Sequence, residues 1–140
     1  YDIEIENINS DIIVFDKACP AFVPFIESEG NLDKEATKNL ISDTLGKTNM
    51  LGVDTVVLGC THYPILKKDI EDYYGNNIKV ISSGREAARE VSTVLGYAKL
   101  HQKKLNKKEH RFFISEESDN FNSIASKWLK KDINAEVVEI

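Results

Sequence analysis

A cysteine, a threonine and a histidine occupy positions 60–62, directly after a short apolar run. Cys60 and His62 are two residues apart, so in an extended segment their side chains face the same side and can share one pocket. A neighbouring imidazolium or a helix N-terminus lowers the pKa of a thiol from about 8.5 into the range of roughly 3.5–7.5. The resulting thiolate can act as a nucleophile or as a base that removes a proton. We therefore take Cys60 as a candidate reactive thiol with His62 as its partner.

The residues around this pair favour an anionic ligand. Gly59 allows a tight turn and a close approach of the ligand to the backbone. Pro64 is well placed as the first residue of a helix, and helix N-termini attract anions. Backbone amides there, together with the Thr61 hydroxyl, would suit a carboxylate.

Cys60 and His62 also fit purely structural roles. A single cysteine after a buried strand is commonly a small core residue, and a single histidine commonly has a structural role. Both are also zinc-ligand types, but structural zinc takes about four ligands. Only Cys19, His101 and His110 could complete such a set, and their spacing matches no known zinc motif. Two cysteines are also too few for a disulfide framework in a chain of this length.

The elements that position these residues alternate between strands and helices. We predict buried strands at residues 11–15, 54–58, 78–81, 111–115 and 135–140. We predict helices around residues 22–26, 33–45, 64–74, 83–98 and 121–129, with Asp33 capping the second and a capping box of Ser83 and Glu86 opening the fourth. The polar, basic stretch 103–109 is expected to be an exposed connector. This alternation predicts α/β architecture with a mainly parallel sheet flanked by helices. Because ligands bind at the carboxyl ends of parallel strands, Cys60 would lie on the functional edge.

Composition excludes several classes of protein. The chain has 140 residues, of which 41% are hydrophobic, and a formal net charge of -5. A mildly acidic chain gives no support to nucleic-acid binding, and no apolar run approaches the ~18 residues of a membrane helix. No signal peptide is visible, so we expect a reducing cytoplasm. The opening at Tyr1, without Met, is expected of a piece of a longer polypeptide.

Several segments resemble glutamate racemases. The run Leu-Gly-Cys-Thr-His-Tyr-Pro at residues 58–64 is similar to the second catalytic motif of that family and is highly specific. Ala-Cys-Pro-Ala-Phe-Val-Pro at 18–24, followed by Ile26 and Glu27, resembles a second family segment. Residues 81–91 and the Phe-Phe-Ile-Ser run at 112–115 resemble two more, in the correct order. The resemblance therefore spans nearly the whole chain and corresponds to the C-terminal half of the family.

The resemblance implies a reaction and roles for individual residues. Glutamate racemases interconvert L- and D-glutamate for bacterial peptidoglycan without pyridoxal phosphate or metal, using two thiols on opposite faces of the substrate. By motif, Cys60 is the second of these thiols, Thr61 binds substrate, and His62 assists proton transfer. Cys19 is not implied as the other thiol, because the Ala-Cys-Pro segment carries none in the family. The other thiol belongs to an N-terminal Cys-Asn-Thr-Ala segment that is missing here, so this chain alone is expected to be inactive.

The family fold implies two α/β domains with the active site between them. On that pattern residues 1–85 form most of one domain, and residues 86–140 return to the other, whose N-terminal part is absent. The expected partners are glutamate, the N-terminal half of the same enzyme and, since oligomeric state varies in the family, a second copy in a homodimer. Ser82 departs from the Asp that many members carry. An aspartate or related racemase and a truncated, non-catalytic binding protein are the alternatives.

Overall fold

The computed structural model describes residues 1–28, 33–46, 52–102, 109–118 and 120–139. The predicted connector 103–109 lies almost entirely outside these residues. The helices are α1 (Asp2–Ile8), α2 (Phe22–Ser28), α3 (Lys34–Leu45), α4 (Lys67–Tyr74), α5 (Ser83–Tyr97) and α6 (Phe121–Leu129), with two 3-10 turns, η1 (Tyr63–Leu66) and η2 (Gly75–Asn77). The strands are β1 (Thr55–Leu58), β2 (Lys79–Ser82), β3 (Phe112–Ile114) and β4 (Ala135–Val137). The predicted α/β class is confirmed.

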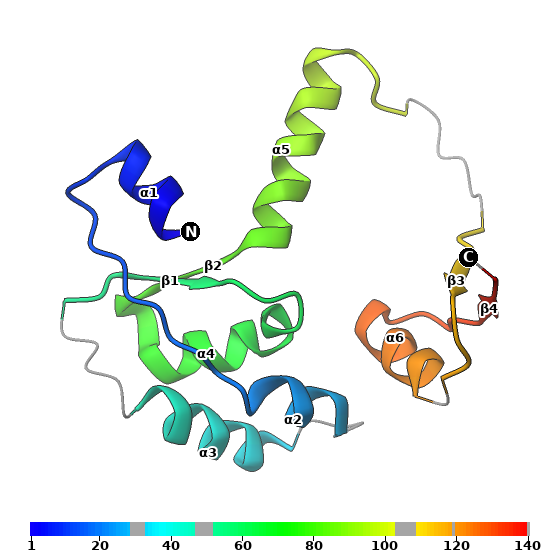
Figure 1. Cartoon of the computed structure of the whole chain (residues 1–140), viewed down its shortest axis with the longest axis horizontal. Coiled ribbons are helices and arrows are strands. Elements are labelled where there is room, and N and C mark those ends of the chain that lie inside the picture. Colours follow the sequence, from blue (N-terminus) through cyan, green and yellow to red (C-terminus); the bar gives the residue numbers. More distant parts are fainter. Residues whose placement is uncertain (29–32, 47–51, 103–108, 119, 140) are drawn as a thin grey trace.

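In the part of the chain that the structure describes, the strands form two separate two-stranded sheets, and both are parallel. β1 pairs with β2 from Thr55 opposite Lys79 to Leu58 opposite Ser82. β3 pairs with β4 from Phe112 opposite Ala135 to Ile114 opposite Val137. α4 packs against β2, and α3 packs against α4 on the same side of the first sheet (Figure 1). The prediction of parallel strands flanked by helices is therefore confirmed.

One core joins α2, α3, α4 and the first sheet. Phe22, Ile41, Leu66 and Ile70 are almost completely buried. The remaining buried members of this cluster are Cys19, Ile26, Leu45, Leu58 and Val80. The predicted cap of α3 is confirmed, because the Asp33 carboxylate accepts hydrogen bonds from the amides of Glu35 and Ala36 at 3.0 and 2.8 Å. Because Leu58 is part of this core, the core fixes the end of β1 and thereby positions the loop that carries Cys60.

The predicted strand at residues 11–15 is absent from the structure. The segment has neither helix nor strand, and Ile12, Ile13 and Phe15 are 51%, 78% and 72% exposed. A strand is stabilised by backbone bonds to a neighbouring strand, and among the described residues β1 pairs only with β2. Residues 11–15 therefore have the apolar pattern of a buried strand, but they find no partner strand among the described residues.

The predicted capping box at Ser83 is also wrong. Ser82 occupies the cap position of α5 and is buried, and its side chain makes no capping hydrogen bond. Ser83 is the first helical residue, and its hydroxyl donates to the carbonyl of Leu58 at 3.4 Å. Glu86 pairs instead with Arg89 at 2.8 Å. Ser83 thus ties the start of α5 to the end of β1, beside the loop that carries Cys60.

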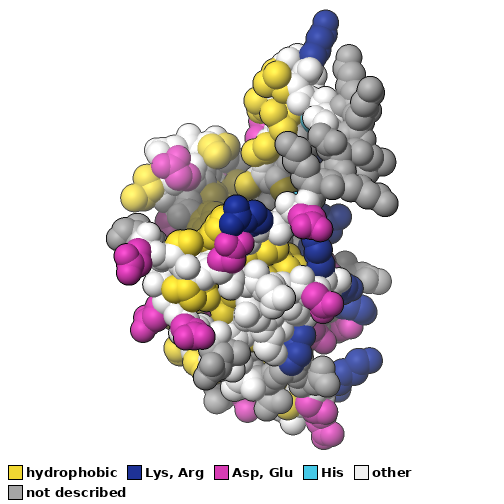
Figure 2. Space-filling model, turned by 90° about the vertical axis from the view of Figure 1, so that its right-hand side faces the viewer, with side chains coloured by type: hydrophobic (Ala, Val, Ile, Leu, Met, Phe, Trp, Pro, Cys, Tyr) yellow, Lys and Arg dark blue, Asp and Glu magenta, His cyan; other side chains and the backbone are white. Residues whose placement is uncertain are grey.

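α5 extends away from the first sheet and has no buried residue among its fifteen (Figure 1). Its apolar side chains Val91 and Val94 are 57% and 55% exposed. Viewed from the side that carries the C-terminal segment, hydrophobic side chains lie at the surface between charged ones (Figure 2). In that segment, Arg111, directly before β3, donates two hydrogen bonds to the carboxylate of Glu136 in β4, at 3.0 and 2.7 Å. No helix in the described residues is long and apolar enough to cross a membrane.

Candidate functional site

A bent loop leads from the end of β1 into η1 and carries the candidate thiol. Cys60 is half-buried and free, Thr61 is exposed, and His62 is half-buried. Gly59 allows a close approach, because a side chain there would begin 3.3 Å from the Tyr1 ring. The loop is bent rather than extended at residues 60–62. Cys60 and His62 therefore meet through this bend and not through strand alternation.

His62 lies between the thiol and a carboxylate. Its Nδ1 atom is 3.9 Å from the Cys60 sulfur, and its Nε2 atom is 2.9 Å from Oε1 of Glu27. Glu27 belongs to α2, 35 positions earlier in the chain. The three residues form a row of thiol, imidazole and carboxylate. The sequence indicated the first two members, whereas nothing in its spacing indicated that Glu27 would reach His62.

The carboxylate fixes which nitrogen of neutral His62 carries the proton. A carboxylate only accepts hydrogen bonds, so Nε2 must donate to Glu27. Nδ1 is then the acceptor and faces the Cys60 thiol, from which it can take the proton. Protonated His62 donates from both nitrogens, to Glu27 and to a Cys60 thiolate. The geometry therefore allows a proton to pass between Cys60 and His62 while Glu27 holds the ring.

Thr61 shares the Nδ1 atom with the thiol. Its hydroxyl lies 3.3 Å from Nδ1, and the side chain is exposed. A hydroxyl can rotate to donate elsewhere without moving its oxygen. Thr61 can thus turn towards a ligand, as its predicted substrate-binding role requires.

Tyr63 anchors the loop to the segment that precedes α2. Its hydroxyl donates to the carbonyl of Cys19 at 3.1 Å, and its ring meets Phe22 edge-on at 5.3 Å between centroids. Burial raises the pKa of Tyr63, and negative charge on Cys19 or Cys60 would raise it further. The hydroxyl therefore stays protonated and donating near neutral pH. This anchor brings α2, and with it Glu27, to the side of His62.

The turn after His62 differs from the predicted helix start. Pro64 lies within η1, whose first bond runs from the Ile65 amide to the His62 carbonyl at 3.0 Å. The α-helix itself begins only at Lys67. A single 3-10 turn has few aligned peptide dipoles, so the expected anion attraction of an α-helix N-terminus is not present beside Thr61.

Cys19 lies apart from this chemistry. It is 6% exposed in the core, where burial raises the pKa of its thiol. Its sulfur donates weakly to the carbonyl of Lys17 at 3.7 Å. Within the described ranges, no three residues of the His, Cys, Asp and Glu types lie close enough together to hold a metal ion.

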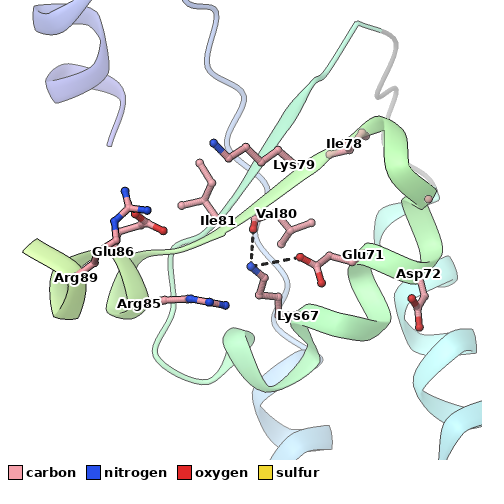
Figure 3. A pocket seen from close by; sticks show the side chains of 11 residues that line it. Lys67, Glu71, Asp72, Ile78, Lys79, Val80, Ile81, Arg85, Glu86 and Arg89 are labelled. Atoms are coloured by element: carbon pink, nitrogen blue, oxygen red, sulfur yellow. Dashed lines mark hydrogen bonds and ion pairs between the residues drawn. The ribbon is translucent and has the colours of Figure 1, made fainter.

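Among the described residues, one hollow lies away from the row and a smaller one lies beside it. The larger, about 550 Å³, runs along β2 and the start of α5 (Figure 3). Within it Lys67 donates to the Val80 carbonyl at 2.9 Å and pairs with Glu71 at 3.3 Å, whereas Lys79 and Arg85 form no ion pair among the described residues. The smaller, about 320 Å³, lies between Glu27 and α6, next to the row of Cys60, His62 and Glu27. The row is the candidate site, because it brings a thiol, an imidazole and a carboxylate together beside the smaller hollow.

The chain is similar over its whole length to known proteins that are about twice as long, and it spans about half of their length. Glutamate racemases from Staphylococcus haemolyticus and Staphylococcus aureus are 41% and 39% identical over all 140 residues, and the chain spans 53% of each. No family model matches the chain.

Solved structures agree. A glutamate racemase isoform of Bacillus anthracis matches all of this chain at 30% identity and a TM-score of 0.77. The Francisella tularensis glutamate racemase, solved in complex with D-glutamate, matches 99% of it at 26% identity and a TM-score of 0.81. The chain covers 52% of each of these structures.

Proposed function

We propose, because this chain is similar along its whole length to the C-terminal half of glutamate racemases, that it supplies one thiol of a glutamate racemase. The observation that carries the proposal is the Cys60 sulfur 3.9 Å from His62 Nδ1, with Glu27 on the opposite nitrogen. The resemblance alone would name the thiol. The geometry adds a route by which that thiol exchanges its proton.

The proposed step begins with transfer of the Cys60 proton to Nδ1 of His62. The thiolate then removes the α-proton of L-glutamate, and the electron pair of the broken C–H bond remains on the substrate as a carbanion. A second thiol, outside this chain, returns a proton to the opposite face and gives D-glutamate. Two bases are needed, because a single base could return the proton to the face it came from.

An α-proton is very weakly acidic and a thiolate is a modest base, so the site must stabilise the carbanion with positioned donors in a dry pocket. Thr61 is proposed to bind the substrate carboxylate through its hydroxyl and amide. No pyridoxal phosphate and no metal take part in this proposal, as the resemblance implies. One half of the site lies on this chain, which alone is expected to be inactive.

The rest of the enzyme supplies the remaining partners. We expect residues 1–85 to form most of one domain and residues 86–140 to join the other, with the active site between them. On this view, the exposed apolar residues of α5 are covered by the N-terminal half of the enzyme. A homodimer, a cytoplasmic location and supply of D-glutamate to peptidoglycan synthesis belong to the same proposal.

The decisive experiment follows α-proton exchange of glutamate in deuterated water by NMR. It compares this chain, a chain extended to the length of its relatives, and the extended Cys60→Ala variant. The expected result is exchange by the extended chain alone, lost in the variant, while a Cys19→Ala control stays active. Exchange of the α-proton of aspartate, but not of glutamate, would instead indicate an aspartate racemase. No exchange by the extended chain with either enantiomer of glutamate would contradict the proposal and favour a binding role.

A further inference from the structure

The indole of Trp128 packs against the imidazole of His62. The ring centroids are 5.4 Å apart and the planes are nearly perpendicular, at 89°. Trp128 lies in α6, 66 positions after His62 and on the C-terminal segment. The candidate site is therefore bordered by three separate parts of the chain, which are α2, the loop after β1, and α6.

A core role does not account for this contact. α6 has no buried residue, and Trp128 itself remains 39% exposed. The hydrophobic core around Phe22 and Leu66 does not include it. What the indole touches is the ring that faces the thiol. An edge-to-face arrangement is a geometry that two aromatic rings prefer.

The orientation of His62 matters because its two ring edges are not equivalent. The bond to Glu27 holds Nε2 but leaves the ring able to rock about the line between the two atoms. Rocking would move Nδ1 away from the Cys60 sulfur, which is already at 3.9 Å. A perpendicular indole beside the ring opposes that motion and keeps water from one side of it.

We propose that Trp128 is a positioning residue, which holds the His62 imidazole with Nδ1 towards Cys60. The inference deepens the proposed function, since it rests on the Cys60–His62 pair, but its tests need no racemisation. Among the described residues, the titratable groups in contact with His62 are Glu27 from α2 and Cys60 from its own loop. Trp128 is the contact that α6 contributes.

Fluorescence of this chain tests the contact directly, because Trp128 is its single tryptophan. An imidazolium in contact with indole quenches its emission. In a Cys60→Ala background, we expect emission to fall reversibly when acidification protonates His62. The change should vanish in His62→Gln and persist in His101→Gln and His110→Gln, which alter the remaining two histidines. A pH response that is absent in the Cys60→Ala chain, or unchanged when His62→Gln is added to it, would overturn the contact.

Thiol alkylation tests the positioning. The rate of Cys60 modification by iodoacetamide is followed by mass spectrometry against pH in the parent, Trp128→Phe and Trp128→Leu. We expect the Trp128→Leu variant to lose the His62-dependent part of the pH profile. The rate of Cys60 alkylation near neutral pH should fall by roughly 2- to 10-fold, which corresponds to the free energy of one aromatic pair. Trp128→Phe should restore it, and circular dichroism reports whether each variant folds. Superimposable profiles for Trp128→Leu and the parent would overturn the proposal, even if the enzyme proves to be a racemase.

Discussion

Nε2 of His62 lies 2.9 Å from Oε1 of Glu27, so a carboxylate on α2 sets the tautomer of a histidine that follows β1. Both side chains remain partly open to solvent, at 26% for His62 and 50% for Glu27. An exposed ion pair of this kind adds little to stability. The pair therefore matters for the orientation and tautomer of His62, because it leaves Nδ1 as the nitrogen that accepts the proton of Cys60.

Replacing Glu27 by Gln should slow proton transfer without unfolding the chain. The amide keeps the shape but lets Nε2 meet either a donor or an acceptor, so the tautomer is no longer fixed. We expect the rate of glutamate exchange in the extended chain to fall by roughly 10- to 100-fold, as for a misplaced catalytic group. The control is Glu35→Gln, on the exposed first turn of α3. Equal rates in the two variants would remove Glu27 from the mechanism.

The two cysteines should differ sharply in reactivity. Cys60 is half-buried beside an imidazole, whereas Cys19 is 6% exposed and burial raises the pKa of its thiol. Only the thiolate is alkylated, so Cys60 should react at least about tenfold faster than Cys19 near neutral pH. Peptide mass spectrometry after a short exposure to iodoacetamide measures both rates. In denaturant the two rates should converge, and a faster Cys19 in the folded chain would contradict the structure.

Alkaline pH should destabilise the fold through Cys19. Burial raises the pKa of the Cys19 thiol in the folded state. A raised pKa means that the contribution to stability is fully present below the unfolded pKa and is lost as pH rises through the folded one. Urea unfolding at about pH 8 and about pH 10 should show a larger loss in the parent than in Cys19→Ala. Burial raises the pKa values of Tyr63 and Tyr74 as well, and a charged Cys19 raises both further, so the difference between the two proteins includes this coupling to the tyrosines.

The local sequence pattern predicted most helices and strands, because the signals that define these elements come from residues within or next to them. Asp33 caps α3 where its side chain reaches the first amides, and Gly75 ends α4 with φ at 68°, a positive angle that glycine adopts without strain. Residues 11–15 are the exception. Their apolar, β-branched pattern indicates that they suit a buried strand, but a pattern in one segment cannot tell whether the partner strand lies in the same chain.

The site shows the same division. Cys60 and His62 are neighbours in sequence, so their types and spacing were enough to pair them. Glu27 and Trp128 lie 35 and 66 positions away from His62. The Tyr63 anchor brings Glu27 to His62 and α6 brings Trp128 to it, so the spacing of residues in the sequence cannot indicate either contact.

Two apolar substitutions should separate the core of this chain from the face of α5. Leu66 is completely buried, so Leu66→Ala should lower the free energy of unfolding by about 2–5 kcal/mol. Val94 on α5 is 55% exposed, so Val94→Ala should change it by less than about 0.5 kcal/mol in this chain alone. Urea unfolding monitored by circular dichroism measures both.

In the chain extended to the length of its relatives, the Val94→Ala substitution should lower the free energy of unfolding by more, because the proposed N-terminal half then covers α5. A large cost in this chain alone would show that α5 already packs against its own core, and an unchanged cost in the extended chain would show that the N-terminal half lies elsewhere.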